Sequence, residues 1–215
     1  MRFYILVFFL SLTMVQAQTY EAGVMLGGVN ALSDIGSQKH LSPSSLGFGL
    51  LFKWNKSQRY AWRAGLSYTN LSFDDKKAQD PARILRNWNG NTGLLELSSG
   101  LEVNFLPYNL HRFGPVFTPY LYSGLTVFRY DYNYFEFGKA KNTNKKDISF
   151  ALPIHFGIKA RIGSNTILGT EIEVRYTFTD NLDGSNPINS NFAVYQFGDI
   201  NNNDWYVFSG ISFTY

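Results

Sequence analysis

The side chains best suited to catalysis in this sequence are its histidines, because the chain contains no cysteine. His155 is the candidate of most interest, since a serine hydroxyl beside it would form a nucleophile and base pair. Ser149 lies six positions away in the same alternating segment, but six extended residues span about 20 Å, so the two side chains cannot meet. Ser67 and Ser98 would have to approach His155 across the fold, and nothing in the sequence places them there. We expect a hydrogen-bonded interior histidine and no enzymatic activity.

Motifs for metals, cofactors and nucleic acids are equally weak. Asp180 and Asp183 precede Gly184, but they lack the ligand spacing of a calcium-binding hand and are typical of a polar turn. Gly47 and Gly49 form half of a dinucleotide fingerprint, yet no helix is expected after them. The formal net charge of +3 is too small to indicate a nucleic-acid partner. We expect no metal, no cofactor and no nucleic acid.

Ionisable residues form the most suggestive set, because ten of them fall on the polar side of alternating segments. Five acids and five bases on one side of a sheet are expected to pair, since buried charges persist only when they are neutralised. The sequence therefore predicts a plug of salt bridges, with a proton or ion path as the alternative. The ten residues are Glu21, Lys53, Arg63, Glu96, Glu102, Lys159, Arg161, Glu171, Glu173 and Arg175.

The elements that must position these charges are strands. From Ile148 to Ile162 every second residue is apolar, while small or charged residues stand between them. Fifteen alternating positions exceed an ordinary strand and are typical of a tilted strand that crosses a bilayer. The pattern predicts eight strands, over residues 20–29, 46–54, 60–68, 95–105, 117–130, 148–162, 168–178 and 205–215.

The connections between these strands alternate in length. Short or moderate links are expected at 55–59, 106–116 and 163–166, and long polar loops at 30–45, 74–92, 131–147 and 181–203. An even strand count with tight turns at one end is the plan of an outer-membrane barrel, and the sheet must close because lipid satisfies no backbone groups. The predicted fold is an all-β, eight-stranded antiparallel transmembrane β-barrel of the outer-membrane type.

Both ends of the sequence carry export signals. Met1–Ala17 has one charge, an apolar stretch and small residues before the expected cleavage site, which predicts a cleaved signal peptide at residues 1–17 and Sec export. The barrel would then occupy residues 18–215. Phe213 and the terminal Tyr215 are similar to the signal that barrels present to the assembly machinery, although a secreted sandwich could end in the same way. The expected location is the outer membrane, in contact with its lipid.

Several segments together resemble the PorG-like family of the Bacteroidetes type IX secretion system. They are spread over almost the whole mature chain: MLGGVNALSDIG, GLLFKWNKSQRYAWRAGLSY, LLELSSGLEVNF, FTPYLYSGL, EVRYTFTDNLD and NNDWYVFSGISFTY. The resemblance implies a non-catalytic barrel that anchors the periplasmic ring of PorK and PorN to the outer membrane.

A binding surface for such a ring is expected in the connection 106–116, which is longer than a turn requires. It contains Tyr108, His111, Arg112 and Phe113, and aromatic residues and arginine are typical binding anchors. The same connection could instead fold over the barrel mouth. Two other functions remain open: an OmpA/OmpX-like surface barrel whose long outer loops bind a ligand or surface, and, less favoured, a lipid-modifying enzyme that uses His155.

Overall fold

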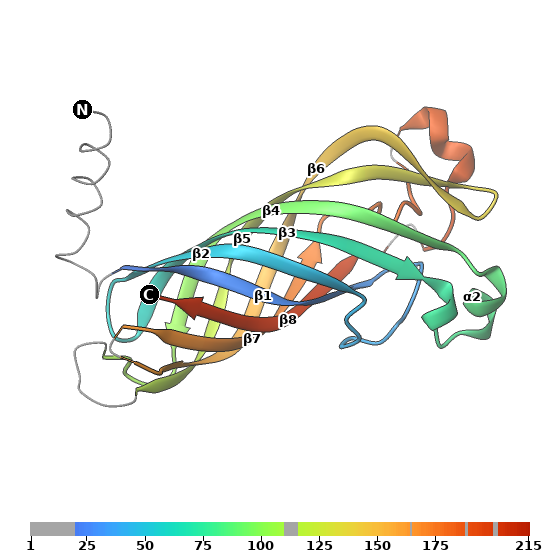
Figure 1. The fold of residues 1–215 in the computed structure, drawn as a ribbon. Helices are drawn as coiled ribbons and strands as arrows, with labels where there is room; N and C mark the ends of the chain where they lie inside the picture. The colour runs from blue at the N-terminus through green and yellow to red at the C-terminus, as the bar shows by residue number, and fades with distance from the viewer. Residues whose placement is uncertain (1–19, 110–115, 164, 188, 200–201) are drawn as a thin grey trace, which may run out of the picture.

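Alternation along the chain produces a closed sheet in which each strand pairs with its sequence neighbours. The computed structural model describes residues 20–109, 116–163, 165–187, 189–199 and 202–215. The sheet runs in the order β1 to β8 and closes through antiparallel pairing of β1 with β8 (Figure 1). The strands are β1 (Tyr20–Leu32), β2 (Ser45–Asn55), β3 (Tyr60–Asp74), β4 (Asn89–Asn104), β5 (Phe117–Glu136), β6 (Lys139–Arg161), β7 (Ile167–Thr177) and β8 (Trp205–Thr214). The predicted eight-stranded barrel is confirmed, and the predicted signal peptide at residues 1–17 lies outside the described residues.

The outer wall is apolar because one side of every strand faces away from the interior. In β2, Leu46, Phe48 and Leu50 are 77%, 60% and 59% exposed, and the outward residues of β6 are similar. A belt of this kind is too large for a water-soluble monomer and matches the apolar band that transmembrane barrels present to lipid. Among the described residues, no helix has the length and apolar character needed to cross a bilayer.

The two ends of the barrel differ. The end with the C-terminal residue has the connections 56–59, 105–116 and 162–166, and we call it the turn end (Figure 1). The opposite end, the loop end, has the connections 33–44, 75–88 and 178–204. These include the short helices η2 (Asp75–Lys77), α2 (Pro81–Arg86) and η3 (Ser190–Tyr195). Since the long loops of outer-membrane barrels are extracellular, the loop end faces outward and the turn end faces the periplasm.

One predicted loop is wrong, because residues 131–147 continue the strands. β5 and β6 pair as far as Glu136 and Lys139, and they form a hairpin that projects beyond the barrel wall (Figure 1). Phe137 and Gly138 close it with φ values of 49° and 77°, as a two-residue turn that suits the twist of the strands requires. Helix η3 packs on the hairpin through Phe192, whose ring lies 4.5 Å from that of Tyr134.

Candidate functional site

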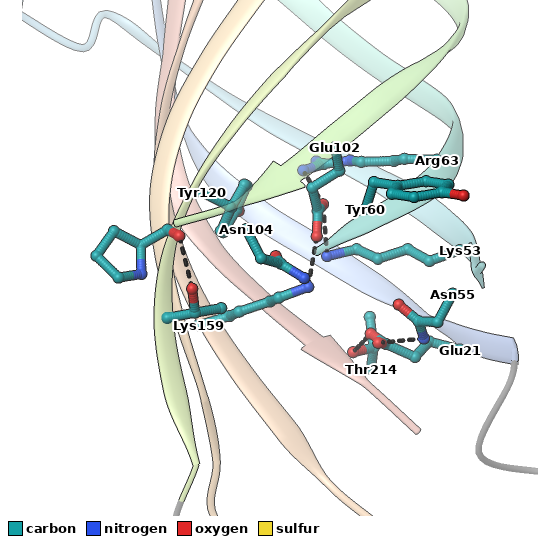
Figure 2. Close-up of polar contacts among 12 residues, drawn as sticks. Glu21, Lys53, Asn55, Tyr60, Arg63, Glu102, Asn104, Tyr120, Lys159 and Thr214 are labelled. Carbon is teal, nitrogen blue, oxygen red and sulfur yellow. Dashed lines mark hydrogen bonds and ion pairs between the residues drawn. The ribbon is translucent and has the colours of Figure 1, made fainter. Parts of the chain in front are cut away.

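The barrel interior contains a network of ion pairs with Glu102 of β4 near the turn end. Its carboxylate lies 2.6 Å from the Nζ atom of Lys159 and 3.0 Å from that of Lys53, and Arg63 is 3.6 Å away. These side chains point toward one another from β2, β3, β4 and β6 (Figure 2). One carboxylate thus joins three cations that are far apart in the sequence.

Arg63 extends the network across the barrel to β7. Its guanidinium donates to both oxygens of Glu171, at 2.6 and 3.1 Å, and lies 3.3 Å from Glu173. The Tyr120 hydroxyl donates to Glu171 at 2.7 Å. Because guanidinium and carboxylate are planar groups that match in a fork, this pair is both strong and directional.

The outer part of the network centres on Arg175 of β7. Its guanidinium pairs with Glu173 on the same strand and lies 2.6 Å from Glu96 of β4. Tyr206 of β8 donates its hydroxyl to Glu96. Four acids, Glu96, Glu102, Glu171 and Glu173, therefore face four bases, and their charges cancel.

The remaining two predicted plug residues, Glu21 and Arg161, lie toward the turn end. Glu21 is buried near the turn end and accepts hydrogen bonds from Asn55 and Thr214, each at 2.8 Å (Figure 2). Arg161 is half-buried at the end of β6, where its charge acts on the nearby Tyr108. Ion pairs thus join the middle of the barrel, and an amide and a hydroxyl group donate to the Glu21 carboxylate near the turn end.

The interior is filled rather than open. Apart from Arg161, every predicted plug residue is at most 3% exposed, and Tyr120, Tyr122 and Phe128 fill the space between them. An eight-stranded barrel is only just wide enough for its own side chains. The described interior therefore has the form of a packed core and not of a pore.

His155 lies inside this core, where its Nδ1 atom is 3.5 Å from Glu173. Neither ring nitrogen has a hydrogen-bond partner, so no serine forms a dyad with it among the described residues. Ligand atoms of His155, Glu171 and Glu173 lie within 4.8 Å of one another, which is a spacing that a metal ion could use. Arg63 and Arg175 already bind both carboxylates, however, so a cation would have to displace buried guanidinium groups.

At the turn end, Tyr108 and Val116, from the described parts of the connection between β4 and β5, pack at the barrel mouth. Tyr108 is 3% exposed beside Val116 and Ile167, and the Nζ atom of Lys159 lies 4.5 Å from the centre of its ring. The expectation of an exposed anchor at Tyr108 is therefore corrected: burial against the mouth removes its ring from the surface. His111, Arg112 and Phe113 lie outside the described residues.

At the loop end, the loops cover the mouth with a cap that the sequence did not predict. Leu182 is fully buried; its carbonyl accepts from Thr92, and its N–H donates to the Asp204 carboxylate at 2.9 Å. Asp183 accepts from the N–H of Ile35 at 3.2 Å and so joins the first loop to the last. Loop aspartates thus act as acceptors for buried backbone donors, which stabilises a defined loop structure.

Burial changes the acidity of the cap. Burial is the main cause that raises the pKa of Asp180 to about 6, and repulsion from neighbouring acids, including Asp34, adds to it. Burial also raises the pKa values of Asp183 and Asp204, which repel each other. Asp75 is the exception: burial alone would raise its pKa, but a hydrogen bond from Arg86 and others from backbone N–H groups lower it.

Comparison with known proteins agrees with this geometry. Similar solved structures include Neisserial surface protein A (NspA), at 11% identity and a TM-score of 0.51, covering 92% of this chain and 96% of that chain. Others are Ail, the attachment invasion locus protein of Yersinia pestis (10% identity, TM-score 0.45, 92% and 100% covered) and OprG of Pseudomonas aeruginosa (10%, 0.43, 91% and 95%). No curated protein sequence matches the chain.

These similarities concern the fold. The likeness to NspA extends over nearly the whole of both chains, and the apolar belt found here is the kind of outer surface that transmembrane barrels present to lipid. A family model matches the chain over residues 1–215. The chain therefore belongs to the family described as Domain of unknown function (DUF6089).

Proposed function

We propose that the protein is a non-catalytic outer-membrane component of the type IX secretion system, which anchors the periplasmic PorK and PorN ring. The observation that carries a scaffold role is the filled interior of the described barrel, where buried acids and bases neutralise one another. A barrel whose described interior is filled by its own side chains is expected to act through its surfaces. The resemblance of its segments to the PorG-like family favours the periplasmic surface.

The turn end offers a described surface for such a contact. Lys56 is exposed in the β2–β3 turn, and Leu106 is 42% exposed at the start of the β4–β5 connection. Lys56 lies over the ring of Trp54, with its Nζ atom 3.9 Å from the ring centre, and aromatic side chains are typical anchors for a protein partner. Tyr108 would support this surface from beneath instead of contacting the ring.

The test is affinity purification of the tagged barrel from outer membranes in mild detergent. We expect PorK and PorN to co-purify with the wild type and to be lost from a Lys56→Glu/Leu106→Asp variant. Lys145→Glu at the loop end is the matched control, because it changes an exposed charge equally but at the opposite side of the membrane. Recovery of the wild-type barrel alone, while the ring itself stays intact, would refute the anchoring role.

A second function is favoured by the projecting hairpin of β5 and β6. Phe137 at its tip is 98% exposed and Val194 of η3 is 83% exposed, while lysines line the β6 side. Exposed apolar tips on a rigid support are typical of a surface that binds a ligand outside the cell. Loss of adhesion in a Phe137→Ser/Val194→Ser variant, with secretion unchanged, would favour this function over the first.

A further inference from the structure

The first loop does not stand away from the membrane but folds down the outside of the barrel. Asn30 of β1 occupies an outward position, yet it is only 4% exposed. Its side-chain amide donates to the carbonyls of Lys39 and His40, at 3.2 and 3.1 Å. Val207, its register partner in β8, also lies on the outer side and is 3% exposed. The loop is thus fastened against the wall at the level where the strands leave the membrane.

Beside this loop lies a hollow of about 690 Å³ whose floor belongs to the lipid-facing belt. Ile172 and Val174 of β7 and Trp205 of β8 line it, and all three project outward from the barrel. Ile172 is 42% and Trp205 38% exposed, and Leu41 from the loop is 57% exposed. The hollow is therefore continuous with the apolar surface that meets acyl chains.

The rim of the hollow is polar and carries groups of every hydrogen-bonding kind. It includes carboxylates, amides, an imidazole and a guanidinium, from Asp34, Gln38, His40, Arg83, Asn202 and Asn203. Several are held in place, since Arg83 donates to the Ser33 carbonyl at 2.9 Å and Asn203 to the Tyr176 hydroxyl at 3.0 Å. Donors and acceptors side by side suit hydroxyl groups, which both donate and accept. A purely anionic headgroup would instead meet acids on the rim, among them Asp204.

We propose that this hollow binds one glycolipid molecule of the outer leaflet. Its acyl chain would lie on Ile172, Val174 and Leu41, and its sugar would bind the rim. The volume lies within the range of about 300–1,000 Å³ that is usual for small-molecule sites. The hollow has an apolar floor and a polar rim, and it lies at the outer edge of the lipid belt. These three features suit an amphiphile that is already present in the membrane. The site is independent of any periplasmic partner, because it lies at the opposite end of the barrel.

The test measures which lipid stays on the purified full-length barrel. The protein is reconstituted in vesicles of phosphatidylethanolamine with or without lipid A from which both phosphates have been removed (a neutral glycolipid, called lipid A below), extracted in mild detergent and analysed by native mass spectrometry. We expect one retained lipid A per barrel. Val174→Trp, which fills the floor with a larger apolar side chain, should reduce retention by about tenfold. Val103→Trp is the matched control, since Val103 is an outward residue of β4, a strand adjacent to neither β7 nor β8, and is 41% exposed.

A second variant tests the rim separately from the floor. Gln38→Ala combined with Asn202→Ala should lower the preference for lipid A over phosphatidylethanolamine by about tenfold, with the barrel still folded by its gel mobility before and after heating. Equal retention of both lipids by the wild type would overturn the proposal, as would unchanged retention in Val174→Trp. Binding of the free lipid A sugar as tightly as the lipid would show a soluble ligand and would also overturn it.

Discussion

Removing Arg63 is the sharpest test of the interior network, because this one guanidinium joins three carboxylates. It donates to Glu171 at 2.6 and 3.1 Å and lies 3.3 Å from Glu173 and 3.6 Å from Glu102. In Arg63→Met the apolar volume is largely kept, but four buried acids then face three bases. Glu171 would retain only the Tyr120 hydroxyl among the contacts described above.

The expected loss follows from the burial of the groups left behind. Glu171 is 2% exposed and Glu173 fully buried, so neither carboxylate can recover water after the substitution. Breaking one partner of a buried ion pair costs about 3–5 kcal/mol of unfolding free energy. Replacing both partners with apolar residues is often neutral, and Arg63→Met/Glu171→Leu should therefore recover to within about 1 kcal/mol of the wild type.

The unfolding free energies of the single and the double variant are measured by urea unfolding of the barrel refolded in detergent micelles, with tryptophan fluorescence as the signal. Lys145→Met is the control, since this lysine is exposed on the projecting hairpin and its loss should change stability by about 0.5 kcal/mol or less. A loss below about 1 kcal/mol for Arg63→Met would refute the network argument. So would a double variant that is no more stable than the single one.

Three further outcomes follow from the closed barrel and its cap. In planar bilayers the wild type should show no stable ion conductance, and stepwise currents would contradict the filled interior. Folding raises the pKa of Asp180 to about 6 and also raises the pKa values of Asp183 and Asp204. The cap is therefore most stable below the unfolded pKa of about 3.9, where these carboxyls are protonated, and it loses stability as the pH rises through their folded pKa values. The protection of amides in residues 178–187, which is the intrinsic exchange rate at each pH divided by the observed rate, should therefore rise between pH 8 and pH 5, and a fall in protection would contradict this sign. Gly100→Ala should destabilise the barrel by about 1–3 kcal/mol in the same urea assay, since its new Cβ would clash with the Ser123 carbonyl oxygen. Full stability would show that β4 and β5 can separate there.

The sequence predicts where the strands lie and which side chains point outward, because lipid contacts only one side of each strand. That single-sided contact produces strict alternation in Ile148–Ile162, and the same rule predicted inward positions for residues such as Glu96 and Arg175. The rule fails where both sides of a strand leave the membrane. Residues 131–147 read as a polar loop, since η3 and water, not lipid, contact this hairpin.

The contacts between distant residues could not be predicted in the same way. Alternation assigns a side chain to the interior but not to a height or direction within it, so the pairing of Arg63 with Glu171, 108 residues apart, has no signal in one sequence. The same holds for the loop that folds down the outer wall, which depends on the Asn30 side chain meeting two carbonyls. Tyr108 illustrates a further limit: an aromatic residue in a connection can cover the barrel mouth as well as project from it.

The cross-barrel ion pairs carry information that the apolar exterior lacks. A slip by one residue would turn every outward side chain inward, and the apolar belt opposes it. A slip by two residues would keep all apolar side chains outside, so the exterior cannot exclude it. The interior can, because moving β3 by two residues displaces Arg63 by about 7 Å and separates it from Glu171. Since a buried ion pair adds little net stability but its disruption is costly, the charged filling selects one register among those that lipid would accept.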